Sequence, residues 1–326
     1  MRMLCTLTDV RYVPQVLAMY GSLQAVGDRF VLGVLCMDAM ARTLLERLDL
    51  EDAVIIDVAE LERYDTDAAA ARPTRSHGEY CWTLSSCLPR YLLRERWPEA
   101  DEVTYLDADQ FFFSSLEPVF EQSASVLLMP HRYARSRRHQ EIYGYFNVSV
   151  IVVRRDAVGL AFLDWWRGLC VQWCYGRLED GKFADQKYLD RAPREFDSVE
   201  EIEHVGAGLA PWNVANHRVT SADGRVVVDG RPLINYHFHA LQYRSPPQRS
   251  LLATGYRIPR AVRELVYRPY LGALGRAIDD CDAVMPGTRL ATTTAIPMGT
   301  RLTHVRNRAA SGVFRYAPGV WRRIRS

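Results

Sequence analysis

Residues 103–109 read Val-Thr-Tyr-Leu-Asp-Ala-Asp, a short apolar run that ends in two aspartates. In an open α/β sheet, ligands bind at the carboxyl ends of the strands. Two carboxylates this close repel each other unless a cation lies between them, and Mg²⁺ or Mn²⁺ takes such oxygen ligands and bridges them to phosphates. We therefore interpret Asp107 and Asp109 as a metal–diphosphate site. The alternative, a solvated turn after a strand, is the commoner setting for an isolated Asp-x-Asp.

Before this stretch, segments with the hydrophobic period of a strand alternate with segments that have the period of a helix. The pattern predicts strands over 3–8, 30–37 and 53–58, separated by helices over 13–27 and 39–48. Such a β-α-β-α-β order predicts an α/β fold, with a mostly parallel sheet and helices packed on its faces.

The rest of the chain continues the same pattern less regularly. The expected elements are a loop over 59–80, a helix over 82–96, strands over 125–129 and 146–153, helices over 157–175 and 183–189, and a hairpin of 225–229 with 232–240. After about residue 250 the pattern weakens into short helical pieces. The sequence thus predicts one domain over 1–250 and a helical, Arg-rich extension over 251–326.

The composition limits the possible classes of protein. With 326 residues, 48% of them hydrophobic and 25% charged, the chain is an ordinary globular one, and its net charge of +2 does not indicate nucleic-acid binding. Seven cysteines without a C-x-x-C motif favour a reducing cytoplasm, and we find neither a signal-peptide pattern nor an apolar run of the ~18 residues that span a bilayer. Residues 301–326 hold seven arginines and no acid, which predicts peripheral contact with an anionic membrane or an acidic glycan, or simply a solvated end.

Two histidines, His237 and His239, lie two apart in the aromatic segment 235–239. On a strand, such residues point to the same face. Imidazole is an acceptable ligand for Mn²⁺, so either or both would complete a metal site with Asp107 and Asp109.

Other polar residues have both a structural and a functional interpretation. Asp185 and Gln186 either begin a helix, with the acid complementing its dipole, or contact a ligand. Asn147 either closes a turn or binds a polar ligand, and Trp212-Asn213 is equally ambiguous. Walker A, H-E-x-x-H and G-x-S-x-G motifs are absent from the sequence.

Taken in order, these motifs resemble those of GT-A fold glycosyltransferases, nearest to glycosyltransferase family 8 and related bacterial polysaccharide enzymes. The resemblance covers residues 3–243. It is carried by Leu4-Cys5-Thr6-Leu7-Thr8-Asp9 with Tyr12, Tyr105-Leu106-Asp107-Ala108-Asp109, Gly144-Tyr145-Phe146-Asn147-Val148-Ser149-Val150, Asp185-Gln186, Leu209-Ala210-Pro211-Trp212-Asn213 and the His-Phe-His segment.

The resemblance implies a role for each motif. Thr6, Thr8 and Asp9 would bind the nucleotide, whose base would stack on Tyr12. Asp109 would bind Mn²⁺ or Mg²⁺ with His237 or His239, and Asp107 would share the metal or contact the ribose. The sugar-contacting residues would be Asn147, Asp185 and Gln186.

The activity implied is transfer of a hexose from a nucleotide-diphosphate sugar, such as a UDP-sugar, to a glycan or lipid-linked acceptor. Family resemblance implies retention at the anomeric carbon; in an inverting enzyme, Asp185 would be the general base. Two other functions stay open: a sugar- or nucleotide-binding relative without activity, and a phosphohydrolase of the haloacid dehalogenase type.

The chain also departs from the family pattern. Ser149 stands where glycine is usual, and residues 83–86 lack the basic residue that reaches the diphosphate or donor sugar. Lys182, Lys187 or an arginine of 132–138 would have to replace that residue. The lysine-rich end of the metal–histidine motif is also missing after His239.

Overall fold

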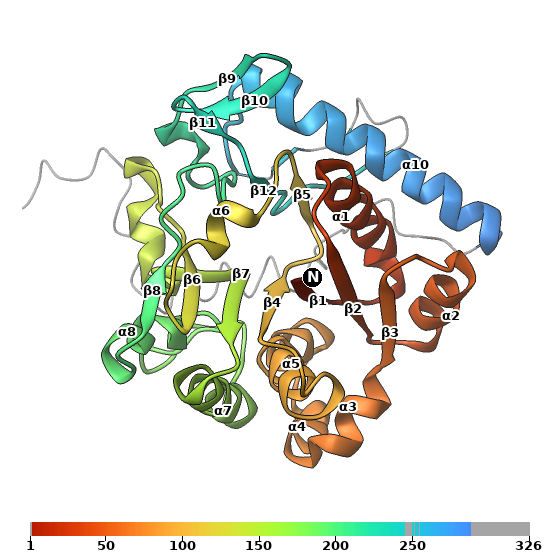
Figure 1. Ribbon diagram of the computed structural model, residues 1–326, viewed down its shortest axis with the longest axis vertical. Coiled ribbons are helices and arrows are strands. Elements are labelled where there is room, and N and C mark those ends of the chain that lie inside the picture. Colours follow the sequence, from red (N-terminus) through yellow and green to blue (C-terminus); the bar gives the residue numbers. More distant parts are fainter. Residues whose placement is uncertain (1, 245–249, 251, 254, 288–326) are drawn as a thin grey trace, which may run out of the picture.

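A seven-stranded mixed sheet runs through the centre of the computed structural model, which describes residues 2–244, 250, 252–253 and 255–287 (Figure 1). In spatial order its strands are β3 (Ala53–Asp57), β2 (Phe30–Cys36), β1 (Arg2–Thr8), β4 (Glu102–Leu106), β7 (Phe146–Arg154), β6 (Val126–Pro130) and β8 (Val199–Glu201). The first four are mutually parallel, whereas β7 is antiparallel to both of its neighbours. The predicted mostly parallel mixed sheet is therefore confirmed.

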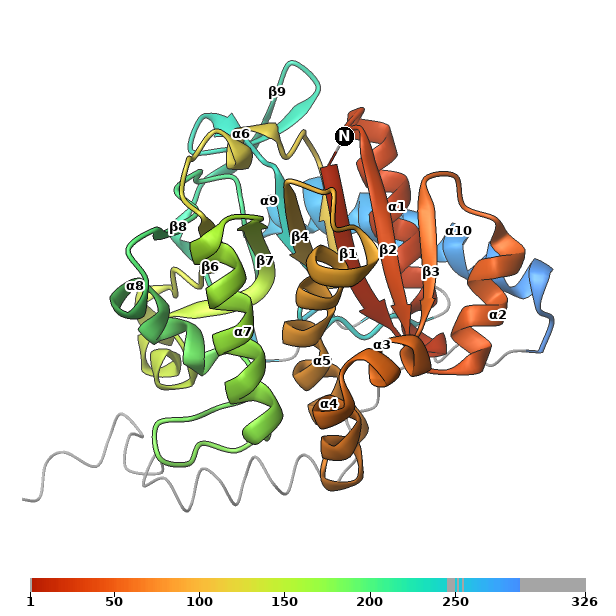
Figure 2. The ribbon, with the colours of Figure 1, turned by 60° about the horizontal axis from the view of Figure 1, so that its bottom comes forward.

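Helices cover both faces of this sheet, and each face has its own apolar core (Figure 2). One face packs against α3 (Val58–Tyr64), α4 (Thr66–Ala71), α5 (His77–Tyr91) and α7 (Ala157–Gln172). The other packs against α1 (Val13–Val26), α2 (Ala39–Leu48), α6 (Glu117–Phe120) and α10 (Arg268–Val284). Because both faces are covered, β2 carries no polar side chain, as is usual for parallel strands, and β1 carries polar side chains only at Arg2, Thr6 and Thr8.

The prediction of a loop over 59–80 is wrong, because α3, α4 and the start of α5 lie in this segment. Aspartates begin the first two helices: the Asp57 side chain accepts from the Ala59 amide, and that of Asp65 accepts from Ala68. The start of α5 is a capping box in which Ser76 and Glu79 each accept from the other's backbone amide. These start signals are present in the sequence, and the Ala-rich run is a strong helix former rather than a loop.

The expected hairpin is confirmed in part. Strands β9 (Val219–Ala222), β10 (Arg225–Val228) and β11 (Arg231–Pro232) form a small antiparallel sheet, and β10 turns into β11 through Asp229 and Gly230, both at positive φ. The chain then leaves this sheet. Residues of β12 (Asn235–His237) pair with the distant strand β5 (Gln110–Phe112) instead.

Several predicted boundaries also shift. The segment expected to be a loop between β6 and β7 contains a 3₁₀ helix, Arg135–Tyr143, and the helix expected over 183–189 is a 3₁₀ helix that begins only at Lys187. The short α8 (Ala192–Glu195) follows it.

Beyond residue 250 the structure is more regular than expected. The α9 helix (Arg260–Val262), a π-helical turn (Arg263–Tyr267) and α10 follow one another without interruption, and α10 lies along α1. Tyr270 and Leu274 of α10 share a core with Ala18 of α1. Among the described residues, no helix is both long and apolar enough to cross a bilayer, and the Arg-rich segment 301–326 lies outside them.

Candidate metal and nucleotide-sugar site

The loop between β4 and β5 carries both aspartates of the Asp-x-Asp motif. The backbone amide of Asp107 donates to the carbonyl of Ser149 on β7, at 3.1 Å, which continues the β4–β7 pairing by one residue. The chain then bends, and its next strand, β5, pairs with β12 so that Gln110 lies opposite His237. The amide of Phe238 donates to the carbonyl of Asp109 at 2.8 Å. Strand pairing thus brings His237 to the two aspartates.

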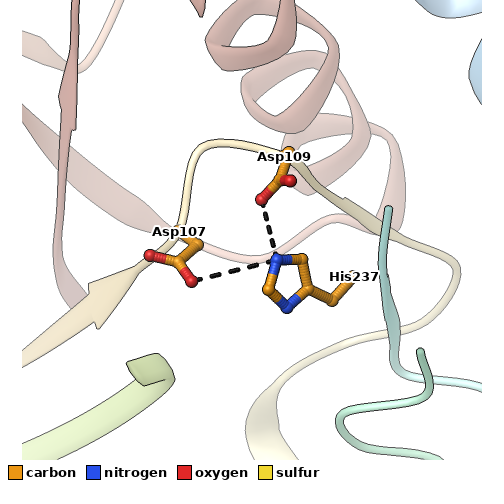
Figure 3. A group of neighbouring side chains, drawn as sticks. All are labelled: Asp107, Asp109 and His237. Atoms are coloured by element: carbon orange, nitrogen blue, oxygen red, sulfur yellow. Dashed lines mark ion pairs between the residues drawn. The ribbon is translucent and has the colours of Figure 1, made fainter. Parts of the chain in front are cut away.

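The three side chains converge on one point (Figure 3). Nε2 of His237 lies 2.9 Å from Oδ1 of Asp109 and 3.9 Å from Oδ2 of Asp107. One ligand atom from each residue falls within 4.8 Å of the other two. The aspartate side chains are 31% and 22% exposed, so solvent and a ligand reach the group from one side.

The electrostatics of the group show a shortage of positive charge. Burial, together with the charge of Asp109, raises the pKa of Asp107 to about 6 despite the nearby His237. Burial also opposes ionisation of Asp109, but its contact with His237 lowers the pKa of that carboxyl. In turn, despite burial, Asp109 raises the pKa of His237. The contact with His237 thus offsets part of the repulsion between the two carboxylates.

The donor set fits a divalent metal. Two carboxylate oxygens and one imidazole nitrogen suit Mn²⁺, and the oxygens also suit Mg²⁺. A cation held between Nε2 of His237 and the two carboxylates would neutralise both acids. Asp107, Asp109 and His237 would therefore hold the metal.

A network of buried side-chain amides fixes the segments that carry Asp109 and His237. The Gln110 side-chain amide donates to the carbonyl of Ser149, and the Asn235 amide donates to Gln110 Oε1. Oδ1 of Asn235 accepts from the Gly208 amide at 3.0 Å. We did not predict this network from the sequence, although a glutamine directly after Asp-x-Asp and an asparagine two residues before His237 were visible there.

His239 is not one of the three side chains that converge, since it lies beyond the end of β12, but it is near enough to Asp109 for each of the two groups to shift the pKa of the other. Trp212 packs against both histidines, with ring centroids 5.3 Å from His237 and 5.4 Å from His239, and the two imidazole rings lie 6.0 Å apart. Asn213 anchors this tryptophan loop: its Nδ2 donates to the carbonyls of His131 and Gly208, each at 3.0 Å. The structure thus gives Asn213 a structural role.

Asp185 is buried on the α5–α7 side of the sheet. Ser85 Oγ lies 2.7 Å from its Oδ2, and the indole of Trp166 donates to its backbone carbonyl at 3.0 Å. Burial, with a further contribution from the charge of Asp107, raises the pKa of Asp185 to about 7. Asp185 and Asp107 thus act on each other electrostatically.

Asn147 and Gln186 differ in how much hydrogen-bonding capacity they have left. Oδ1 of Asn147 accepts from the Ser149 amide at 3.0 Å, but its buried Nδ2 has no partner among the described residues. Nε2 of Gln186 donates to the carbonyl of Tyr143 at 2.9 Å. A buried amide without a partner is costly, so Asn147 is the residue better placed to donate to a ligand.

The four predicted nucleotide-binding residues lie at the carboxyl end of β1. Thr6 Oγ1 is buried without a partner among the described residues, whereas Thr8 Oγ1 donates to the Asp9 carbonyl at 2.9 Å. Burial and the charges of Asp109 and Asp9 raise the pKa of Tyr12. Tyr12 is therefore close enough to Asp9 and to Asp109 to feel the charge of both.

Four of the cations proposed to replace the family's basic residue have protein partners. Lys187 pairs with Asp190 at 2.8 Å, and Lys182 lies over the ring of Trp173 at 5.0 Å. Arg132 donates to backbone carbonyls of residues 202–207, and Arg137 donates to the Gly255 carbonyl. Each would have to exchange a protein partner for a phosphate.

Asp185→Asn is expected to raise the free energy of unfolding by about 4 kcal/mol at pH 8 and by about 1–2 kcal/mol at pH 5. The pKa of about 7 in the folded protein is above the ordinary 3.8, so the unfolded carboxyl ionises first as pH rises. Stability from this group is thus complete below about pH 4 and is lost as pH rises towards 7. An amide has no charge to desolvate, and urea unfolding at both pH values measures the difference. An equal effect at pH 5 and pH 8 would contradict it, and Asp101→Asn, at an exposed position, is the control.

Comparison with known proteins identifies relatives and a fold. No family model matches the sequence. The chain is 30% identical over 287 residues to the uncharacterized protein YfnD of Bacillus subtilis (strain 168), covering 86% of this chain and 91% of YfnD. It is 32% identical over 244 residues to the uncharacterized protein YfnF of the same organism, covering 72% of this chain and 80% of YfnF.

Among solved structures, the galactosyltransferase LgtC, in complex with donor and acceptor sugar analogs, matches with a TM-score of 0.55. The identity is 16%, and the match covers 84% of this chain and 95% of LgtC. An active-site mutant of LgtC matches with a TM-score of 0.51 and 15% identity. These matches confirm the GT-A fold expected from the sequence.

Proposed function

We propose that this chain, which belongs to the same family as YfnD and YfnF of Bacillus subtilis, is a metal-dependent glycosyltransferase. It would transfer a hexose from a nucleotide-diphosphate sugar, most simply a UDP-sugar, to a glycan or lipid-linked acceptor, with retention at the anomeric carbon. The narrower relation to glycosyltransferase family 8 is part of this proposal. The observation that carries it is the convergence of Asp107, Asp109 and His237 at the carboxyl end of β4 in a GT-A fold.

The residues around the group divide into a nucleotide end and a sugar end. Thr6 and Thr8 at the end of β1, with Asp9 directly after it, would form the nucleotide end, and Tyr12, which feels the charges of Asp9 and Asp109, would stack on the base. A bound Mn²⁺ or Mg²⁺ would offset the negative charge that develops on the departing nucleoside diphosphate. Lys187 would add a positive charge to that end on release from Asp190.

On the sugar side, Asn147 has a buried N–H without a partner that can donate to a sugar hydroxyl. Gln186 and Asp185 would hold the sugar from the other side, so that the anomeric carbon faces the acceptor. With a pKa of about 7, Asp185 is present in both the ionised and the protonated form near neutral pH, so it can accept a hydrogen bond from a sugar hydroxyl or donate one to it.

Purified full-length protein tests the proposal directly. A thermal-shift screen of nucleotide-sugars with and without Mn²⁺ finds the donor, because binding stabilises the folded state. Release of nucleoside diphosphate is then measured with glycan and lipid-linked acceptors, and NMR of the product shows whether the anomeric configuration is retained or inverted. Tight binding without release of nucleoside diphosphate would favour a non-catalytic binding protein. The phosphohydrolase alternative loses support from the fold, because its motif belongs near the first strand and this one follows β4.

His237→Ala is expected to raise the Mn²⁺ concentration for half-maximal activity by about 100-fold, whereas His239→Ala changes it less than about threefold. Only His237 presents a nitrogen to both aspartates, and His239 lies beyond the strand. A metal titration of turnover for both variants measures the difference. Equal losses in the two variants would show that both histidines ligate.

A further inference from the structure

The carboxylate of Asp9, at the proposed nucleotide end of the site, accepts hydrogen bonds from several donors of the protein itself. Its Oδ1 accepts from the backbone amides of Arg11 at 2.9 Å and Tyr12 at 3.2 Å. Its Oδ2 accepts from Nε of Arg11 at 3.0 Å, from Nη2 of the same residue, and from Nε2 of His77 at 2.9 Å. A carboxylate has about four lone-pair positions, so these contacts leave none for an N–H group of a nucleotide base.

The hydrogen bond to Asp9 fixes the side chain of His77. This residue is the first of α5, and its side chain is 49% exposed. Nε2 faces Asp9, and the Sγ atom of Cys81 lies 3.8 Å from that same nitrogen. The hydrogen bond to Asp9 raises the pKa of His77 to about 10, so both ring nitrogens carry a proton at neutral pH.

The other ring nitrogen of His77, Nδ1, is available for a hydrogen bond to a ligand. Within residues 2–244 and the described part beyond them, Nδ1 of His77 has no hydrogen-bond partner, although the ring is fixed at Nε2. A histidine held at one nitrogen presents the other in a defined direction. At this end of the site, Nδ1 of His77 is therefore a hydrogen-bond donor with a fixed direction. The acceptor atoms of Asp9 are already hydrogen-bonded to other residues of the protein.

We propose that His77 reads the nucleotide base, donating its Nδ1–H to a carbonyl oxygen on the base edge while Asp9 orients the ring through Nε2. This inference rests on the proposed function and narrows its donor. The preferred bases are those with a ring carbonyl, such as uracil, thymine or guanine, whereas adenine has none. Asp9 is then a positioning residue that acts through His77.

Two isosteric substitutions separate the two nitrogens of this histidine. The amide of glutamine can reach the position of Nε2, and that of asparagine the position of Nδ1. His77→Gln should thus keep the contact with Asp9 but lose the donor to the base, whereas His77→Asn should do the reverse. His217→Ala is the matched control, because it breaks another His–Asp pair, 2.7 Å to Asp229, next to the small β9–β10 sheet.

The test is calorimetry with Mn²⁺ present, using UDP, ADP and inorganic pyrophosphate on the full-length protein and its variants. We expect the wild type to bind UDP more tightly than ADP. His77→Ala and His77→Gln should weaken UDP about tenfold, or about 1.4 kcal/mol, and leave ADP and pyrophosphate unchanged. His77→Asn should stay within about threefold of the wild type, and His217→Ala should match it.

Unchanged UDP affinity in His77→Ala and His77→Gln would overturn the inference and leave the proposed function standing. An equal loss for pyrophosphate would also overturn it, because His77 would then act on the phosphates. A wild-type protein that binds neither UDP nor ADP would contradict the proposed function itself, and with it this inference. Thermal unfolding of each variant shows that the compared proteins are folded.

Discussion

Asp109→Asn is expected to lower metal-dependent sugar transfer by about 100- to 1000-fold while leaving the fold intact. Asp109 makes the shortest contact with His237 in the metal group, and an amide there would keep the shape but lose the negative charge that holds a cation. Because the metal would act mainly as the diphosphate departs, the loss should fall on kcat and on the Mn²⁺ requirement together. The measurement is turnover across a Mn²⁺ titration with the donor identified in the thermal-shift screen.

Two controls make this result specific. Asp101→Asn changes an exposed aspartate just before β4 and should retain full activity. Thermal unfolding of the metal-free proteins should show Asp109→Asn folded but somewhat less stable than the wild type, because the substitution removes the charged contact with His237 that lowers the pKa of Asp109. Undiminished metal-dependent turnover in Asp109→Asn would remove the central site from the proposal.

Trp166→Ala is expected to lower the free energy of unfolding by about 3–5 kcal/mol. The side chain is fully buried in the core between the sheet and α5, packs against Phe162 and donates to the backbone carbonyl of Asp185. The substitution thus removes a large apolar group, leaves a cavity and deprives the buried carbonyl of Asp185 of its hydrogen-bond donor. Urea denaturation followed by circular dichroism measures the loss.

Two neighbouring substitutions separate packing from hydrogen bonding. Trp166→Phe keeps most of the apolar volume but loses the donor to Asp185, so it should cost about 1–2 kcal/mol and lower sugar transfer more than its stability alone explains. Trp165→Ala removes the adjacent, partly exposed tryptophan and should cost less than Trp166→Ala. Equal costs for the two tryptophan-to-alanine variants would contradict the burial assigned to Trp166.

Local sequence signals predicted the elements of the sheet well. The apolar runs that became β1, β2, β3, β4, β6 and β7 were each visible as short hydrophobic segments, because buried strands must be apolar on both faces. Where the prediction missed, as over 59–80, the helix starts were in fact encoded by Asp57, Asp65 and the Ser76–Glu79 capping box. Those errors came from reading an Ala-rich run as a loop.

Pairing between distant segments could not be read in the same way. The sequence suggested a strand at 232–240 but assigned it to the hairpin with β10, whereas residues 235–237 pair with β5. Either partner satisfies the backbone hydrogen bonds of so short a strand. Which one wins depends on the packing of its aromatic residues against α10, information that no local window contains.

By itself, the sequence determined the α/β class, the Asp-x-Asp motif at a strand end, and the candidate set around it, because hydrophobic period and residue chemistry are local properties. Only the tertiary structure chose His237 over His239 for the metal group and showed that Asp9 is already occupied by Arg11 and His77. The contacts of His237 with Asp109 and of His77 with Asp9 join residues more than sixty positions apart, so they are decided by strand register and helix placement rather than by any single motif.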